Sequence, residues 1–308
     1  MAAIWRKPVL WLILFLTWCL AWLPRPFNLA LGDLGGRLFF AAFRRRRVIA
    51  LDNVSQAQAN GYIDPDVPAT RIALGSFRNL GRTAAESFCL MHRGLDCFKG
   101  RVEFVGADEL TALIAQAKSG GAGLVLITAH AGNWELAPAA LSGAFNFDIS
   151  VVGRSQGELS NEILTRLRSR GGGLFIFKDG GARIMLKILR QGGVIGTLFD
   201  QADIVGTGGA KLLFMGREAL TTLGPFRLAA ASGAAVVPLF CRRDGQKHII
   251  EIHPAIKPPA NPKDRRWLLS AAQLCNDLLS DFLRRHPEQW MWSHRRWKKP
   301  EKPKEEIS

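Results

Sequence analysis

Paired cysteines are absent from this chain of 308 residues. Its five cysteines are an odd number without a C-x-x-C pair: Cys19, Cys89, Cys97, Cys241 and Cys275. That pattern argues against a disulfide framework or a zinc site, and it indicates a reducing compartment. We interpret these residues as small buried side chains. Cys241 has no base near it in the sequence, so covalent catalysis by this thiol is not expected.

Acidic residues are scarce, with 26 against 41 basic ones, which leaves a net charge of +15. Such a balance attracts nucleic acid, anionic lipid or an acidic protein. Residues 1–50 hold eight basic side chains and one acidic one around an apolar stretch, which favours an anionic membrane. Zinc-finger spacing and aromatic-rich RNA-binding signatures are missing. Nucleic-acid binding therefore remains only an alternative.

Long hydrophobic runs are also missing. Residues 9–23 are apolar except for Thr17, but fifteen helical residues span only about 22 Å of a hydrocarbon core of roughly 30 Å. Either a short span or an interfacial helix is possible, and the tryptophans of this segment fit an interface. No small residues mark a cleavage site, so we expect the segment to be retained. The basic run 44–47 outweighs Arg6 and Lys7, which predicts that the bulk of the chain faces the cytoplasm.

Beyond this segment, strand-like and helix-like patterns alternate. Helices are expected at 69–92, from Asp108 to Gly120, and at 266–285. Between the second and third of these, strands are expected at 124–128, 147–152, 174–177, 194–199, 234–240 and 248–252, with helices at 134–142, 159–169, 182–191 and 220–231. The pattern predicts an α/β fold with a mixed, largely parallel sheet flanked by helices, and a hairpin across Asp244 and Gly245. We divide the chain into an N-terminal membrane anchor (1–47), a main domain (48–300) and a disordered tail (301–308).

The strongest candidate site follows the first of these strands. His130 stands at the carboxyl end of the strand 124–128, where open α/β sheets bind ligands. Gly132 allows a tight turn, and Asn133 is a good cap for the next helix. On one continuous helix, His130 and Glu135 would point about 140° apart, but a strand–turn–helix break allows the carboxylate to meet the imidazole. Such a pair can remove a proton from an alcohol. The alternative is a structural histidine beside a solvated first-turn acid.

Several sequence blocks together resemble the lipid A late acyltransferase family. They are HAGNWE from His130 to Glu135, FDQ ending at Gln201, FMGREALTTLGPFRLAAASGAAVVP at 214–238 and PEQWMWSHRRWK at 287–298. The resemblance covers nearly the whole chain. It implies an acyltransferase on a membrane-anchored α/β domain at the cytoplasmic face of the inner membrane, with His130 as general base and Glu135 as its partner.

The resemblance also implies the substrates. The donor would be an acyl-thioester of acyl carrier protein, although coenzyme A stays open. The acceptor would be a hydroxyl of a lipid A precursor, on an acyl chain of a phosphorylated glucosamine disaccharide that often bears Kdo sugars. No metal or cofactor is expected. The FPEGTR block of glycerolipid acyltransferases is missing, which argues against glycerol phosphate. Alternatives are another amphiphilic acceptor (an ornithine lipid, a glycolipid or a lysophospholipid) or a noncatalytic basic membrane-binding protein.

Further candidates for substrate binding are Arg154, Asn133, Asp200 and Gln201. Arg154 matches an arginine position of the family and would stabilise the thioester oxyanion or a phosphate, unless it is a surface residue. Asp200 and Gln201 end a strand and either orient the site or cap a loop. Three weaker expectations concern anion contacts by Lys178 and Arg183, an entrance loop at 206–209, and a C-terminal block of aromatic and basic residues at 290–299. That block is expected to pack on the sheet and to meet lipid headgroups or the acidic carrier protein.

Overall fold

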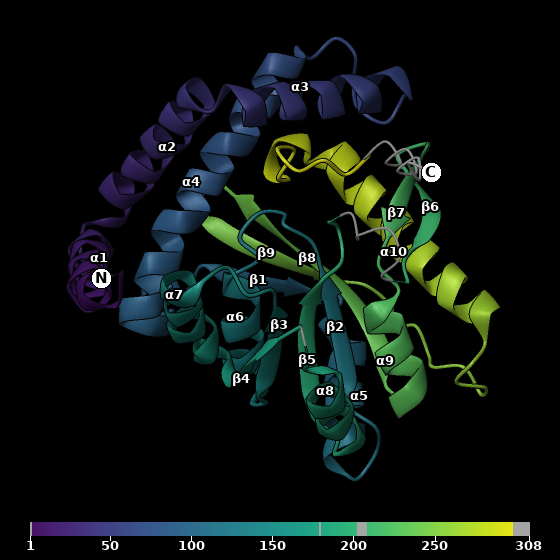
Figure 1. Cartoon of the computed structure of the whole chain (residues 1–308). Helices are drawn as coiled ribbons and strands as arrows, with labels where there is room; N and C mark the ends of the chain where they lie inside the picture. Colours follow the sequence, from purple (N-terminus) through teal and green to yellow (C-terminus); the bar gives the residue numbers. More distant parts are fainter. Residues whose placement is uncertain (1, 179, 202–207, 298–308) are drawn as a thin grey trace, which may run out of the picture.

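The computed structural model describes residues 2–178, 180–201 and 208–297 (Figure 1). The helices are α1 (Ala2–Ala21), α2 (Arg25–Ala42), α3 (Arg44–Ala59), α4 (Ala69–Arg93), α5 (Ala107–Lys118), α6 (Leu136–Phe145), α7 (Glu158–Arg168), α8 (Ala182–Arg190), α9 (Gly224–Ser232) and α10 (Arg265–Arg285). The strands are β1 (Val102–Val105), β2 (Leu124–Thr128), β3 (Ile149–Gly153), β4 (Gly172–Phe177), β5 (Val194–Leu198), β6 (Ala210–Phe214), β7 (Arg217–Thr221), β8 (Ala235–Asp244) and β9 (Lys247–Ile252). The predicted disordered tail lies outside the described residues.

Seven strands form the main sheet in the order β1-β9-β8-β2-β5-β3-β4. Neighbours are parallel except β8 and β9, which form the predicted hairpin across Asp244 and Gly245. The predicted mixed, largely parallel sheet is therefore confirmed. A separate antiparallel hairpin, β6–β7, lies beside α10.

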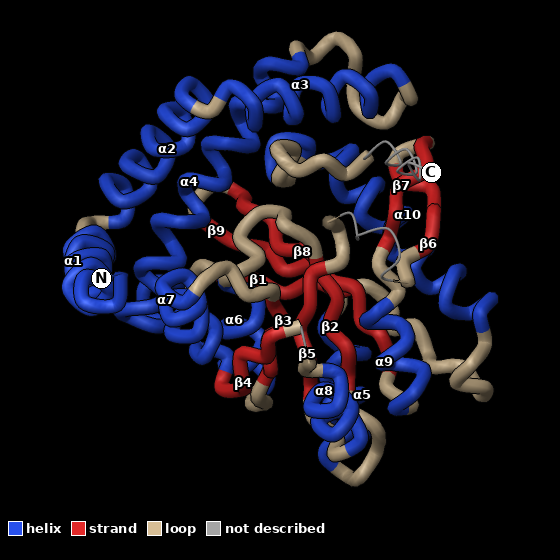
Figure 2. Tube along the Cα trace, viewed as in Figure 1, coloured by secondary structure: helices blue, strands red, loops and turns tan. Residues whose placement is uncertain are grey.

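Helices cover both faces of the sheet (Figure 2). Successive side chains of a strand point to opposite faces. Val125 and Ile127 of β2 accordingly join the cluster that contains α9 and α10, while Leu124 and Leu126 join the cluster that contains α5 and α6. This two-sided burial explains why β2 reads as a continuous apolar run.

Helix α4 lies between the sheet and the N-terminal helices (Figure 1). Glycines let α2 and α4 approach closely: a Cβ on Gly81 would lie 2.0 Å from the carbonyl oxygen of Gly32, and one on Gly36 would lie 2.2 Å from that of Phe77. The Asp33 carboxylate joins the two helices through ion pairs with Arg78 and Arg82 of α4, and it also pairs with Arg37 of α2 itself. Helix α2 is thus fixed to α4, while the predicted domain boundary after residue 47 stays a prediction.

Some elements differ from the sequence-based expectations. Strands β1, β6 and β7 and helices α2 and α3 were not predicted. The segment 220–231, expected as one helix, holds the end of β7 and then α9. Helix α5 begins after Gly106, whose φ of +75° suits glycine, so Asp108 lies in the first turn and is not the cap.

Helix α1 confirms that the apolar N-terminal segment is helical. Within the described part of the chain, however, no helix combines the length and apolar character needed to cross a membrane. The predicted membrane-anchoring role of this segment is therefore not supported by a spanning helix.

Candidate active site

The turn after β2 places His130 at the carboxyl edge of the sheet. Gly132 makes this turn possible, because its φ is +57° and a Cβ there would lie 1.8 Å from the carbonyl oxygen of Cys241. Its own carbonyl oxygen accepts hydrogen bonds from Thr83 Oγ1 at 2.8 Å and Asn79 Nδ2 at 3.1 Å. The turn is therefore held against both β8 and α4.

His130 pairs with Asp200. The ring Nδ1 lies 2.8 Å from Asp200 Oδ1, and the backbone N–H of His130 donates to Asp200 Oδ2 at 3.1 Å. Strand register explains the meeting: β2 and β5 are parallel neighbours with Thr128 opposite Leu198, and each member of the pair comes two residues later. The carboxylate on the imidazole is thus Asp200, where the sequence predicted Glu135.

The surroundings of Asp200 keep it ionised. Burial by itself raises the pKa of Asp200, but the charge and hydrogen bonds of His130, together with the Trp290 indole, hold that pKa at about 2. An ionised carboxylate only accepts hydrogen bonds, so Nδ1 of His130 carries a proton. The other ring nitrogen, Nε2, is then free to accept one. Gln201 Nε2 lies 3.4 Å from it.

Glu135 binds an arginine. Its Oε1 accepts from Arg168 at 2.7 Å and its Oε2 at 3.0 Å, and the Trp134 indole adds a third bond at 3.0 Å. Burial raises the pKa of Glu135, but the Arg168 charge and hydrogen bonds outweigh it and leave the pKa below its usual value. Because the bidentate partner comes from α7, the carboxylate is engaged there and not at the His130 ring.

A cavity of about 510 Å³ lies beside His130. Much of its wall is apolar and includes Val125, Val152, Met185, Ile195 and Leu228. Four cationic side chains also line it: Arg154, Arg168, Lys178 and Arg227. The described lining contains no carboxylate side chain. The cavity therefore combines an apolar interior, an imidazole and positive charge.

The remaining predicted residues divide between this cavity and the protein interior. Arg154, Gln201 and Lys178 line the cavity. Asn133 is 1 % exposed, and it binds Glu86 Oε2 and the backbone N–H of Leu136, the first residue of α6. The cap position of α6 is Glu135 and not the predicted Asn133, and Asn133 lies outside the described cavity lining.

The other weak candidates are less central. Arg183 is exposed and lies outside the described cavity lining. Burial raises the pKa of the Cys241 thiol to about 12, which keeps it protonated and unreactive. In the predicted entrance loop, residues 206–207 lie outside the described residues, while Gly208 lies against Arg227 of the cavity lining.

The C-terminal aromatic block is mostly interior. Trp290, Trp292, Arg296 and Trp297 are buried, so these side chains pack and do not meet headgroups. Residues 298 and 299 lie outside the described part. Sequence reasoning missed the contact of Trp290 with Asp200 and the roles of Arg168 and Arg227 in the cavity wall. No local pattern marks these residues, since each reaches the site from a distant part of the chain.

The chain is similar to known bacterial acyltransferases. The profile of the bacterial lipid A biosynthesis acyltransferase family matches residues 3–299. The chain is 27% identical over 299 residues to the lipid A biosynthesis lauroyltransferase of Escherichia coli, spanning 94% of this chain and 90% of that protein. It is 26% identical over 242 residues to a phosphatidylinositol mannoside acyltransferase of Mycobacterium tuberculosis, spanning 76% of this chain and 73% of that one. The chain belongs to the bacterial lipid A biosynthesis acyltransferase family and is an enzyme that transfers acyl groups to lipid acceptors.

Proposed function

We propose that this enzyme moves a fatty acyl group from a thioester of acyl carrier protein to a hydroxyl of a lipid A precursor, with His130 as general base. The observation that carries the proposal is the position of His130. Its Nδ1 is fixed by an ionised carboxylate, and its ring lines an apolar cavity of about 510 Å³. An acyl chain suits that cavity, and an acceptor hydroxyl that replaces the Gln201 amide suits the unprotonated Nε2.

The reaction follows from this arrangement. Nε2 of His130 takes the proton of the acceptor hydroxyl while its oxygen attacks the thioester carbonyl. Asp200 stabilises the imidazolium that forms, as the aspartate of a Ser-His-Asp triad does. Collapse of the tetrahedral intermediate breaks the C–S bond, and the imidazolium returns the proton to the departing thiolate. Arg154 lines the same cavity and supplies positive charge for the oxyanion.

Glu135 takes a supporting role in this proposal. Its bidentate bond holds Arg168 at the cavity wall, which adds a second cation near the reacting centre. The surplus of basic residues in the chain favours an acidic donor protein over a small thioester.

The acceptor is the finer part of the proposal, since the two relatives are named for different acceptors. The cationic side chains that line the cavity, Arg154, Lys178 and Arg227 beside the Glu135-bound Arg168, favour a phosphorylated acceptor. Lipid A precursors carry phosphate on the sugar that bears the acyl chains. The competing acceptor is a mannosylated phosphoinositide, as named for the mycobacterial relative.

An acceptor panel tests the proposal. The purified enzyme is incubated with radiolabelled acyl carrier protein thioester and, separately, a Kdo-bearing lipid A precursor, a phosphatidylinositol mannoside and a lysophospholipid. We expect an acylated product with the first acceptor at a rate at least tenfold above the others. Preference for the mannoside would replace the proposed acceptor, and thioester turnover with none of them would contradict the proposal. The same panel with acyl-coenzyme A distinguishes the donors.

We also propose that residues 1–47 bind the cytoplasmic face of the inner membrane. Two helical stripes support this, each with large apolar side chains exposed at intervals of three or four residues. We call them the N-terminal apolar surface: Trp11, Phe15 and Trp18 of α1 with Trp22 directly after it, and Phe27, Leu31, Leu34 and Leu38 of α2. Exposed cations at the start of α3, Arg44 and Arg45, adjoin α2 and suit anionic headgroups.

Vesicle binding checks this surface. The double variant Trp11→Glu/Phe15→Glu removes two aromatic groups that are 66 % and 59 % exposed, so folding should tolerate the change. We expect its affinity for vesicles containing phosphatidylglycerol to fall at least about tenfold, given the transfer energy of such side chains. Leu174→Glu is the matched control, because Leu174 is 61 % exposed on β4. Equal vesicle binding by the unchanged protein, the double variant and Leu174→Glu would contradict the proposed membrane contact.

A further inference from the structure

The C-terminal strap (residues 287–297) runs along the His130 turn. The backbone N–H of Met291 donates to the carbonyl oxygen of His130 at 3.1 Å, and that of Gly132 donates to the carbonyl oxygen of Gln289 at 2.7 Å. An isolated antiparallel bridge joins Ala131 to Trp290. The strap therefore pairs with the turn as a short additional strand would.

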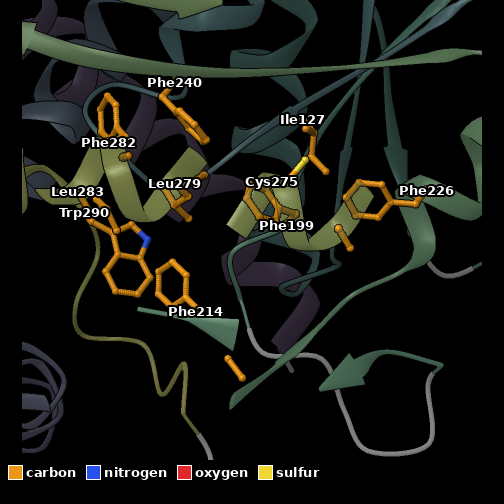
Figure 3. Packing of buried hydrophobic residues seen from close by; sticks show 14 of the residues in the cluster. Ile127, Phe199, Phe214, Phe226, Phe240, Cys275, Leu279, Phe282, Leu283 and Trp290 are labelled. Carbon is orange, nitrogen blue, oxygen red and sulfur yellow. The ribbon is translucent and has the colours of Figure 1, made fainter. Parts of the chain in front are cut away.

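Trp290 reaches from the strap to the carboxylate of the site. Its indole N–H donates to Asp200 Oδ2 at 2.7 Å. The indole packs against Phe214, with ring centroids 5.4 Å apart (Figure 3), and against Trp292, with centroids 4.8 Å apart. At 1 % exposure, the ring has little freedom to move.

Among the described residues, three donors hold Asp200, and one of them is independent of His130. Two come from His130 itself, through its backbone N–H and Nδ1. The third is the Trp290 indole. Rotation of a carboxylate about its last torsion angle is soft, so a fixed outside donor decides which way the two oxygens point.

We propose that Trp290 is a positioning residue, whose indole N–H sets the orientation of Asp200 and thereby the ring position of His130. The inference rests on the proposed role of His130 as general base. With Oδ2 held by the indole, Oδ1 faces Nδ1, and the imidazole keeps the tautomer that leaves Nε2 open to the substrate.

The strap is itself held by several hydrogen bonds, so the position of the Trp290 indole is fixed. Asn53 of α3 donates to the carbonyl oxygens of Trp292 and His294, each at 2.7 Å. Ser76 of α4 donates to the carbonyl oxygen of Trp290. Arg296, fully buried, donates to three oxygens from β7 and α10, those of Leu220, Thr221 and Asn276.

Two tryptophans of the strap provide a matched test. The Trp292 indole is also buried, but its N–H donates to the carbonyl oxygen of Pro287 at 2.7 Å. Trp290→Phe and Trp292→Phe therefore each remove one buried N–H, and only the first removes it from Asp200. A hydrogen bond to a charged group contributes more than a neutral one. We expect kcat of Trp290→Phe to fall about 10- to 100-fold with KM within about twofold, while Trp292→Phe keeps kcat and loses similar thermal stability.

A second variant and a spectroscopic measurement guard against a folding defect. Incorporation of benzothienylalanine at position 290 keeps the bicyclic shape and replaces the N–H by sulfur, and we expect the same fall in kcat. In proton NMR, the Nδ1 proton shared by His130 and Asp200 should shift in both Trp290 variants and stay unchanged in Trp292→Phe.

Equal kcat losses in both phenylalanine variants, or an unshifted Nδ1 proton in the Trp290 variants, would overturn the positioning role. The outcome is separable from the proposed function. If His130→Ala is inactive while both Trp290 variants are fully active, only the positioning role of Trp290 fails. If His130→Ala is active, the proposed catalytic role of His130 fails instead.

Discussion

Substitution of His130 by alanine is expected to lower the acyl-transfer rate at least about 100-fold while the protein stays folded. General base catalysis contributes about 10²- to 10⁴-fold, and no other described imidazole lines the cavity. The backbone groups of residue 130 keep their bonds to Met291 and Asp200 in the variant. Asp200 also keeps the Trp290 indole, so its buried charge stays partly compensated and the loss of stability should be small.

The measurement is transfer of labelled acyl groups to the lipid acceptor, with circular dichroism and the thermal midpoint as checks of folding. His286→Ala is a suitable control, because His286 follows the end of α10 and lies outside the described cavity lining. That variant should transfer at the rate of the unchanged protein. Full activity of His130→Ala would exclude the proposed base.

Asp200→Asn is expected to lower kcat by about 10²- to 10⁴-fold, by analogy with the same change in serine-protease triads. Every hydrogen bond that the described residues make to the Asp200 carboxylate comes from an N–H donor: His130 Nδ1, the His130 backbone and the Trp290 indole. An asparagine must turn its own NH₂ toward one of them. If it faces Nδ1, the ring tautomer reverses and Nε2 becomes protonated. If it faces the indole, two donors collide.

Glu135→Gln is the comparison that decides which carboxylate serves His130. The change weakens the ion pair with Arg168, and we expect a smaller loss of kcat, of about tenfold, together with lower thermal stability because Arg168 loses its charged partner. The reverse order, with Glu135→Gln more damaging than Asp200→Asn, would restore the sequence-based assignment of Glu135 as the partner of His130. Single-turnover rates at saturating donor separate the two cases.

Sequence reasoning located His130 because its signals are local. A buried apolar strand followed by glycine identifies the carboxyl edge of a sheet. The partner on Nδ1 was predicted to be Glu135, whereas the structure has Asp200 there, because that contact depends on β2 and β5 being neighbours in a register that pairs Thr128 with Leu198. Strand order arises from the packing of the whole chain, and neither segment encodes it alone. The short spacing between His130 and Glu135 therefore did not identify the partner of the imidazole, which lies seventy residues away at Asp200.

Helix α2 was missed for another physical reason. The residues that it buries are Asn28, Asp33 and Gly36. Of its large apolar side chains, Phe39 and Phe40 pack against the core, while Phe27, Leu31, Leu34 and Leu38 are exposed. The inward-facing residues therefore do not form the apolar stripe by which an amphipathic helix is recognised. The hairpin β6–β7 was missed because its turn uses Met215 with φ of +49° before Gly216, a conformation that methionine rarely adopts.

The carboxylate of Glu86, which binds Asn133, connects the His130 turn to distant parts of the chain. The Glu86 carboxylate, 1 % exposed, binds Asn133, His248 of β9, Arg243 of β8 and Arg25 at the start of α2. One side chain thus joins the amino-terminal helices to the turn that carries His130. Trimming the chain to residue 48 in search of a more tractable enzyme would delete Arg25 and unbalance a buried charge that holds this turn. The amino-terminal segment therefore supports the turn that carries His130. The protein is better purified at full length in detergent or lipid than as a truncated chain.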